Sequence, residues 1–271
     1  MRFVTTTPAF KVGDLEVLPV SDGTCKLPPS YFVGSDWSAH QELIGPDGMV
    51  TGQLACFVVR TGERTVLVDS GVGPYDNPFF QGGKLPAALE AAGVGRDEID
   101  IVVCSHLHAD HAGWLVHEGE PFFPNATVRF GLPDWDQFVT DTSAPVWIRE
   151  AMLLLEERGR VEPVDGDTVA IAPGITARFA PGHTHGHQVL VLSSSNERAV
   201  LLGDAITCPV QLEEPDWQAV SDVDADLAAR TRQALMAELE GTDDLVIAAH
   251  FPDLRFGRVL LGEGRRWFGP V

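Results

Sequence analysis

Residues 105 to 113, Ser-His-Leu-His-Ala-Asp-His-Ala-Gly, concentrate side chains that can bind a metal ion. Three of the nine histidines of the chain and one carboxylate fall within six positions, at His106, His108, Asp110 and His111. Imidazole nitrogens and carboxylate oxygens are ligands that suit zinc, iron and manganese. The segment therefore predicts a metal site.

The elements around this segment explain how its side chains could be positioned. Residues 99 to 104 form a short apolar, β-branched run that is typical of a buried strand. Elsewhere in the chain, too, side chains that can bind a metal stand directly before or after an apolar run that is typical of a strand. The further candidates at strand ends are Asp69, His183, Asp204 and His250, with His185 and His187 beside them. We expect these strand ends to complete the site.

Other elements follow from pattern and turn signals. Apolar runs at 53–60 and 65–69 predict a β-hairpin, and residues 21–23 predict a turn that closes a strand. Residues 26–50 predict a long loop, of the kind that forms lids, in which Tyr31, Phe32 and Trp37 are candidates to line a pocket or to pack the loop onto the body. Helices are expected at residues 86–92, 133–139, 146–158 and 224–239.

Composition excludes several classes of function. The chain has 271 residues with 39 acidic against 19 basic side chains, a formal net charge of −20 that repels phosphate backbones and anionic membranes. No apolar stretch approaches the ~20 residues of a membrane span. Four scattered cysteines suggest no disulfide framework. We expect a single cytoplasmic domain over residues 1–271 that binds neither nucleic acid nor membrane.

The motifs together resemble those of the metallo-β-lactamase superfamily. They are His106-x-His108-x-Asp110-His111, the upstream Asp69-Ser70-Gly71, Pro181-Gly182-His183-x-x-Gly186-His187, Gly203-Asp204, and His250 after an apolar strand. The resemblance covers most of the chain. It implies an α+β fold, a four-layer αβ/βα sandwich of two mixed β-sheets flanked by helices, with the metals at one edge.

The resemblance also implies the ligand sets. His106, His108 and His183 would hold one metal; Asp110, His111 and His250 would hold the other, with Asp204 between them. The cofactors would be two divalent ions, zinc first, with iron or manganese as alternatives.

Such a site can hydrolyse a substrate without a serine or cysteine nucleophile. Two cations about 3.5 to 4 Å apart hold a bridging hydroxide and polarise a carbonyl or phosphoryl oxygen. Asp69 is expected to accept a hydrogen bond from a ligand imidazole or the hydroxide, and Asp110 to act both as ligand and as proton shuttle. His187 is predicted to hydrogen bond beneath the site. His185 is left open as a residue of the rim.

Residues 203–211, followed by Pro215-x-Trp217 and Asp222-x-Asp224, resemble the branch of N-acyl-homoserine lactonases and methyl-parathion-hydrolase-like phosphotriesterases. Thr207 departs from that branch, whose members often place a tyrosine or histidine there in contact with a substrate oxygen. The expected pocket lining comes from loops. It comprises Thr207, Phe32, Phe79, Phe80, Trp135 and Trp147.

The sequence therefore predicts a binuclear hydrolase acting on a lactone, ester or phosphotriester of a small, largely apolar substrate. Enzyme alternatives are a glyoxalase-II-like thioesterase and a β-lactamase-type amide hydrolase. A mononuclear iron persulfide dioxygenase and a non-catalytic scaffold of the same fold are alternatives of other classes. A homodimer is left open.

Overall fold

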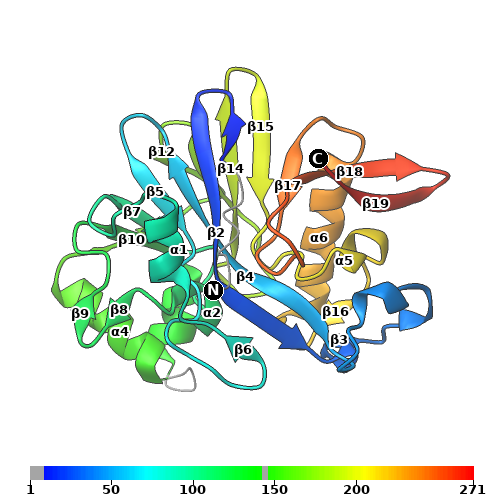
Figure 1. Ribbon diagram of the computed structural model, residues 1–271, viewed down its shortest axis with the longest axis horizontal. Coiled ribbons are helices and arrows are strands. Elements are labelled where there is room, and N and C mark those ends of the chain that lie inside the picture. Colours follow the sequence, from blue (N-terminus) through cyan, green and yellow to red (C-terminus); the bar gives the residue numbers. More distant parts are fainter. Residues whose placement is uncertain (1–8, 142–145) are drawn as a thin grey trace.

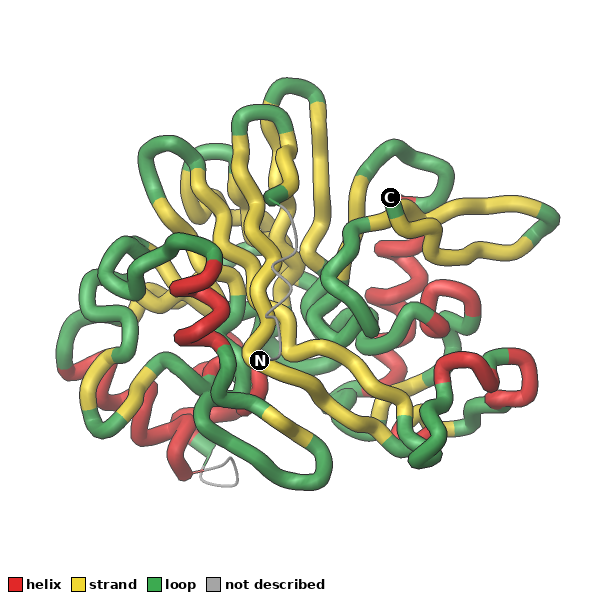
Figure 2. Tube along the Cα trace, in the orientation of Figure 1, coloured by secondary structure: helices red, strands yellow, loops and turns green. Residues whose placement is uncertain are grey.

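A computed structural model describes residues 9–141 and 146–271. Two mixed β-sheets lie face to face and helices cover their outer faces (Figures 1 and 2). This is the four-layer arrangement that the sequence predicts. Within the described ranges, no helix has the length and apolarity needed to cross a membrane.

The first sheet has the order β1-β2-β4-β5-β7-β10-β11, with β6 paired to β2. Its strands are β1 (Phe10–Val12), β2 (Leu15–Leu27), β4 (Val50–Arg60), β5 (Thr65–Val68), β6 (Phe80–Gln81), β7 (Ile101–Val103), β10 (Thr127–Gly131) and β11 (Val161–Val164). The strands from β5 to β11 run parallel, whereas the N-terminal strands form antiparallel pairs.

The second sheet has the order β12-β13-β14-β15-β17-β18-β19. Its strands are β12 (Thr168–Ala172), β13 (Ile175–Phe179), β14 (Gln188–Ser194), β15 (Glu197–Leu201), β17 (Leu245–Ile247), β18 (Gly257–Gly262) and β19 (Arg265–Pro270). The pair β15 and β17 is parallel and the other pairs are antiparallel. Two small ribbons pair β3 (Phe32–Val33) with β16 (Gln218–Ala219) and β8 (Val116–His117) with β9 (Glu120–Pro121).

Successive side chains of a strand point to opposite faces of the sheet, so the apolar side chains are divided between two cores. In β4, Phe57 and Val59 join the core between the sheets, whereas Cys56 and Val58 join the core beneath the helices of the first sheet. This two-residue period is what a strand buried on both faces requires. Helices complete the outer layers: α1 (Leu85–Ala91), α2 (Ala109–Ala112), α3 (Pro133–Trp135), α4 (Val146–Glu157), α5 (Val210–Glu213) and α6 (Ala225–Leu239).

The helices agree with prediction at α1, α4 and α6. Asp224 caps α6 by accepting a hydrogen bond from the Leu227 amide at 2.9 Å, and Leu235, Met236 and Leu239 bury its apolar face. The helix expected over residues 133–139 instead changes after α3 into a wider π turn over Asp136–Thr140. The hairpin of β18 and β19 was not predicted, because its strands carry arginines and glycines that mask a strand pattern.

The turn predicted at residues 21–23 is wrong, because β2 runs through it to Leu27. A register shift between Ser21 and Thr24 forms a bulge, and the bulge directs the Asp22 carboxylate into the protein. Its two oxygens accept hydrogen bonds from the amides of Val72, Gly73 and Leu85 and from the Trp114 indole, at 2.7 to 3.0 Å. Asp22 thus joins the loop after β5 to α1. Burial raises the pKa of its carboxyl group, although these four donors oppose the rise.

Replacing Asp22 should destabilise the fold, because four buried donors lose their acceptor. We expect Asp22→Ala to lower the free energy of unfolding by about 3 to 5 kcal/mol, and Asp22→Asn to lower it less because one carbonyl oxygen remains. Urea denaturation followed by circular dichroism measures both. Asp243→Ala, at a fully exposed carboxylate, is the matched control. Equal stability of Asp22→Ala and this control would contradict the role given to Asp22.

Candidate metal centre

Three imidazoles converge at the first group. The Nε2 atom of His106 lies 2.9 Å from Nδ1 of His108, which lies 3.0 Å from Nε2 of His183. Burial, and then the neighbouring imidazoles, lower the pKa of His108 to about 3, so its ring is neutral at ordinary pH. Neutral nitrogens that face one another at these distances offer lone pairs to a single cation.

A second group lies beside the first and contains Asp110, His111 and His250. One ligand atom from each of these residues falls within 4.8 Å of the others. The Asp110 Oδ2 atom is 3.2 Å from Nε2 of His250 and 3.9 Å from Nε2 of His111. Two nitrogens and one carboxylate oxygen are an ordinary ligand set for a divalent transition metal.

The Asp204 carboxylate lies between the two groups. Its Oδ2 atom is 3.5 Å from Nε2 of His183, in the first group. Its Oδ1 atom is 3.4 Å from Nε2 of His111 and 3.3 Å from Nε2 of His250, in the second group. Each oxygen of one side chain therefore faces a different group.

The residues present fit two cations. Nε2 of His111 and Oδ1 of Asp204 are buried, and neither has a hydrogen-bond partner in the described part of the chain. Burial lowers the pKa of His111, but Asp69, Asp204 and Asp110 outweigh it and raise the pKa to about 10. The carboxylates thus create a potential that favours positive charge at this point, and divalent cations would satisfy both the potential and the unpaired atoms.

The ligands come from ends of strands in both sheets. His106 and His108 follow β7, and the short helix α2 carries Asp110 and His111 (Figure 1). The other three ligands lie at strand ends of the second sheet. His183 lies between β13 and β14, Asp204 after β15, and His250 after β17. The structure therefore brings all seven sequence-predicted ligands to one place.

Asp69 orients one of these ligands. Its Oδ2 atom accepts a hydrogen bond from Nδ1 of His111 at 2.9 Å, and its two oxygens accept the amide and hydroxyl hydrogens of Ser105 at 2.7 and 3.0 Å. The Asp69 backbone has a φ of 59°, a conformation that non-glycine residues rarely adopt. With Nδ1 of His111 donating to Asp69, Nε2 is the nitrogen that would bind a metal, which would take the place of its proton.

Two more ligands are oriented in the same way. Nδ1 of His250 donates to the carbonyl oxygen of Gln53 at 2.8 Å, and Nδ1 of His183 donates to Oδ1 of Asp222 at 3.0 Å. Asp222 also pairs with the buried guanidinium of Arg232 at 3.4 Å. Asp222 belongs to a motif that is visible in the sequence, but its contact with His183 was not predicted, because nothing in the spacing links the two residues.

The remaining histidines take different positions. Nε2 of His187 accepts the Asp204 amide hydrogen at 3.0 Å, and its Nδ1 donates to the Ala180 carbonyl at 3.1 Å. His187 therefore hydrogen bonds directly beneath the site. His185 is exposed, and its amide donates to Gln137 Oε1 at 3.2 Å.

Asp134 joins the two histidine loops and was not predicted. Its carboxylate accepts hydrogen bonds from the amides of Leu107 and Gly186 at 3.0 and 2.6 Å, and from the Thr184 hydroxyl at 3.1 Å. Burial raises its pKa to about 6, although these donors oppose the rise. In the sequence it is one of many acids at a helix start, so no signal distinguished it.

A cavity of about 220 Å³ opens on the second group. Its lining combines metal-site residues with apolar and hydroxyl side chains: Cys25, Leu27, Tyr31, Phe80, Leu107, His108, Ala109, Asp110, Phe138, Asp204, Thr207, Ser221 and His250. Thr207 and Phe80 therefore line it, as expected. Tyr31, from the loop expected at residues 26–50, lines it as well, whereas Phe138 and Ser221 were not predicted as lining residues.

Four aromatics expected in the lining lie elsewhere. Phe32 is buried against Trp37 and Trp217. Phe79 is half exposed, since its neighbour Phe80 takes the inward position. Trp135 stacks on Phe130 with ring centroids 6.0 Å apart, and Trp147 stacks on Tyr75 at 6.4 Å. Single-sequence patterns do not determine which side of a loop faces a cavity.

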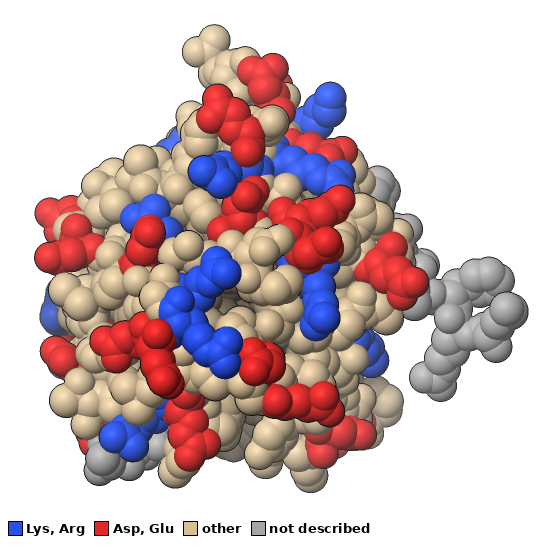
Figure 3. Space-filling model, turned by 90° about the vertical axis from the view of Figure 1, so that its left-hand side faces the viewer, with Lys and Arg blue, Asp and Glu red and all other residues tan. Residues whose placement is uncertain are grey.

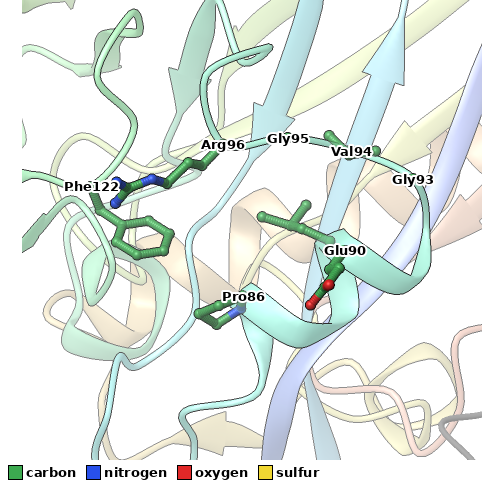
Figure 4. A pocket seen from close by; sticks show the side chains of 8 residues that line it. Pro86, Glu90, Gly93, Val94, Gly95, Arg96 and Phe122 are labelled. Carbon is green, nitrogen blue, oxygen red and sulfur yellow. The ribbon is translucent and has the colours of Figure 1, made fainter.

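A larger hollow of about 330 Å³ lies away from the metal groups, between α1 and Phe122 (Figure 4). Arg96 stands over the Phe122 ring with its Cζ atom 5.3 Å from the centroid. None of the predicted metal ligands lines this hollow. On the face drawn in Figure 3, acidic side chains are widely spread among fewer basic ones, in keeping with the net charge of −20.

Comparisons with known proteins agree with this geometry. A family model described as "Metallo-beta-lactamase superfamily" matches residues 50–250. The N-acyl homoserine lactonase AiiA of Bacillus thuringiensis subsp. kurstaki is 24% identical over 194 residues, which cover 64% of this chain and 73% of that protein. The acyl-coenzyme A thioesterase MBLAC2 of Gallus gallus is 23% identical over 206 residues, 72% of this chain and 71% of that protein.

Solved structures share the fold over nearly the whole chain. AidC, described as a dizinc quorum-quenching lactonase in complex with a product, superposes with a TM-score of 0.87 at 21% identity and covers 97% of both chains. The hydrolase AbOPH has a TM-score of 0.87 at 23% identity, covering 100% of this chain and 99% of that one. The sandwich fold predicted from the sequence is confirmed.

Metal content tests the position of Asp204. We expect the purified protein to bind two divalent ions per chain and Asp204→Ala to bind one or fewer, because each carboxylate oxygen faces a different group. Inductively coupled plasma mass spectrometry after equilibration with zinc gives the ratio. Asp243→Ala, at an exposed carboxylate, should still bind two. Two tightly bound ions in Asp204→Ala would refute the bridging position.

The raised pKa of Asp134 predicts a pH dependence of stability. The folded pKa of about 6 exceeds the ordinary value of 3.8, so the folded state binds more protons than the unfolded state between those pH values. The contribution of Asp134 to stability is therefore greatest below about pH 4 and falls as pH rises to about 6.

The test compares the free energies of unfolding of the metal-free wild type and of metal-free Asp134→Asn. The difference, wild type minus variant, should decrease by about 2 to 3 kcal/mol between pH 4 and pH 7. Urea denaturation at each pH measures the difference. A difference that is flat or increases with pH would show that the carboxyl group is not held in its neutral form by burial.

Proposed function

Since the chain belongs to the metallo-beta-lactamase superfamily, we propose that it is a binuclear metal-dependent hydrolase of small lactones. The observation that carries the proposal is the Asp204 carboxylate, whose two oxygens face two complete ligand groups at 3.3 to 3.5 Å. Relatives described as N-acyl homoserine lactonases and a structural neighbour described as dizinc support the substrate class and the metal. We propose zinc at both positions, with iron or manganese as alternatives.

When bound, two divalent cations supply Lewis-acid polarisation of the substrate oxygen and increase the acidity of water. The residues of the chain hold the reacting groups in place. Asp69 fixes the His111 ring through Nδ1, Asp222 fixes His183, and the Gln53 carbonyl fixes His250. Their hydrogen bonds leave the opposite ring nitrogens free to bind metal.

Asp110 is positioned to move a proton. Its carboxylate lines the cavity and is partly exposed. Burial raises the pKa of Asp110, but His111 and His250 outweigh it and lower the pKa to about 2. The position of this carboxylate, at the cavity and 3.2 Å from Nε2 of His250, is what would allow it to accept a proton from the nucleophile and pass it to the leaving oxygen of the opened ring.

The cavity lining favours neutral, apolar substrates. Leu27, Phe80, Leu107 and Phe138 contribute apolar surface. Among the described residues, no lysine or arginine lines the cavity, and the surface carries excess negative charge. Glutathione or coenzyme A thioesters and β-lactams bear anionic groups that such a cavity does not neutralise. Esters and phosphotriesters of similar size remain the second substrate class.

The alternatives of other classes fit less well. A mononuclear iron dioxygenase requires only one metal site, whereas this chain also has the second group of Asp110, His111 and His250. A non-catalytic scaffold does not require a complete set of metal ligands. We further propose that residues 1–271 act as one domain, because one core packs between both sheets. A cytoplasmic location fits four free cysteines. Homodimerisation stays a prediction.

A substrate panel tests the proposed function. The zinc-loaded protein should hydrolyse lactones at least tenfold more efficiently, in kcat/KM, than phosphotriesters, thioesters and β-lactams. Asp110→Asn should lower kcat by about 100-fold or more with little change in KM, because proton transfer typically contributes 10²- to 10⁴-fold. Preference for a thioester, or an unchanged turnover number in Asp110→Asn, would overturn the substrate class or the proton-transfer role respectively.

A further inference from the structure

Three hydroxyl groups line the cavity beside the metal groups, and none of them binds metal in the ligand sets described above. They belong to Tyr31, Thr207 and Ser221. Tyr31 and Ser221 come from segments 190 positions apart in the sequence and share a short hydrogen bond between their side-chain oxygens. Thr207 is buried, and its Oγ1 atom has no hydrogen-bond partner in the described part of the chain.

Counting protons shows that one donor in the Tyr31–Ser221 pair is unused. Two hydroxyl groups carry two protons, and the one hydrogen bond between them uses one. Among the described residues, neither side chain makes another hydrogen bond. A polar donor in a largely apolar cavity is costly unless it has an acceptor. The remaining proton can be donated into the cavity, to an oxygen of a bound substrate.

Tyr31 is held in position by packing and by backbone hydrogen bonds. It ends a 3-10 turn that begins at Pro29, and its amide donates to the Pro28 carbonyl at 2.8 Å. Its own carbonyl accepts the Val220 amide at 2.9 Å. The Tyr31 ring meets Phe32 edge to face at 5.2 Å. Phe32 thus serves the cavity indirectly, as the buried neighbour of the residue that lines it.

Ser221 connects this phenol to the metal site. The next residue, Asp222, accepts a hydrogen bond from Nδ1 of His183 and pairs with Arg232. The two neighbouring side chains therefore fix a metal-ligand imidazole and the Tyr31 hydroxyl. This arrangement fixes a hydroxyl donor in the same cavity that Asp110, Asp204 and His250 line. A donor fixed in advance is the main requirement for stabilising an oxyanion.

We propose that Tyr31 is a catalytic residue whose hydroxyl, oriented by Ser221, donates a hydrogen bond to the acyl oxygen of the substrate. Thr207 is buried and has a shorter side chain, so the longer Tyr31 side chain is the better candidate to reach that oxygen. The inference rests on the proposed lactone hydrolysis, in which that oxygen gains negative charge as the ring opens. Burial raises the pKa of Tyr31, so the phenol keeps its proton at neutral pH. Ser221 is a positioning residue that acts through Tyr31.

The test uses the zinc-loaded protein with N-hexanoyl-homoserine lactone and its ring-opened product. Tyr31→Phe should lower kcat/KM for the lactone by 10- to 100-fold. It should also weaken binding of the product, measured by isothermal titration calorimetry, by at least fivefold, with two zinc ions per chain retained. Tyr75→Phe changes the only other tyrosine of the chain, which is half exposed, and should leave both values within twofold of wild type.

A double-mutant cycle separates the positioning role of Ser221 from a structural one. Ser221→Ala should lower kcat/KM by 3- to 10-fold in the presence of Tyr31 and by less than twofold in the Tyr31→Phe background. Additive losses, or a Tyr31→Phe variant with unchanged kcat/KM and product affinity, would overturn the inference while leaving lactone hydrolysis intact. A wild-type protein that does not hydrolyse the lactone would overturn the proposed function itself.

Discussion

Bringing several imidazoles and carboxylates together away from water is unfavourable unless positive charge is added, and this constraint governs the structure around the metal groups. His106 and His108 approach within 2.9 Å, and Asp204 lies within 3.5 Å of imidazoles in both groups. Cations relieve the repulsion between lone pairs and between carboxylates. Bound cations would therefore stabilise the edge at which the strand ends of both sheets meet.

Besides Asp69, three more buried carboxylates outside the ligand set hold the loops that carry the ligands. Asp22 joins the loop after β5 to α1, Asp134 joins the two histidine loops, and Asp222 holds His183. A carboxylate suits this task because its two oxygens accept several backbone donors from separate segments. Loops without regular secondary structure thus acquire fixed positions. Part of the acidic composition of the chain therefore stabilises loops inside the protein, in addition to the acidic residues on its surface.

The cavity combines an apolar lining with hydroxyl groups rather than with basic side chains. Apolar walls lower the local dielectric constant, which strengthens every hydrogen bond and charge interaction made by a reacting oxygen. Because the lining lacks a basic residue among the described positions, charge neutralisation is left to the metals. In the proposed reaction, selectivity would then depend on the shape of the cavity and on the hydroxyl groups that line it, those of Tyr31, Thr207 and Ser221.

The sequence by itself determined the ligand types, their order and the fold class, because metal ligation demands particular side chains at strand ends and this demand leaves a pattern in the chain. His106, His108, Asp110 and His111 are recognisable for that reason. Only the tertiary structure decided the hydrogen bonds of Asp22, Asp134 and Tyr31, and the positions of Phe32, Phe79, Trp135 and Trp147. A buried acid and a surface acid look alike in sequence. Whether an aromatic side chain faces a cavity or a core depends on contacts between segments that local sequence patterns do not encode.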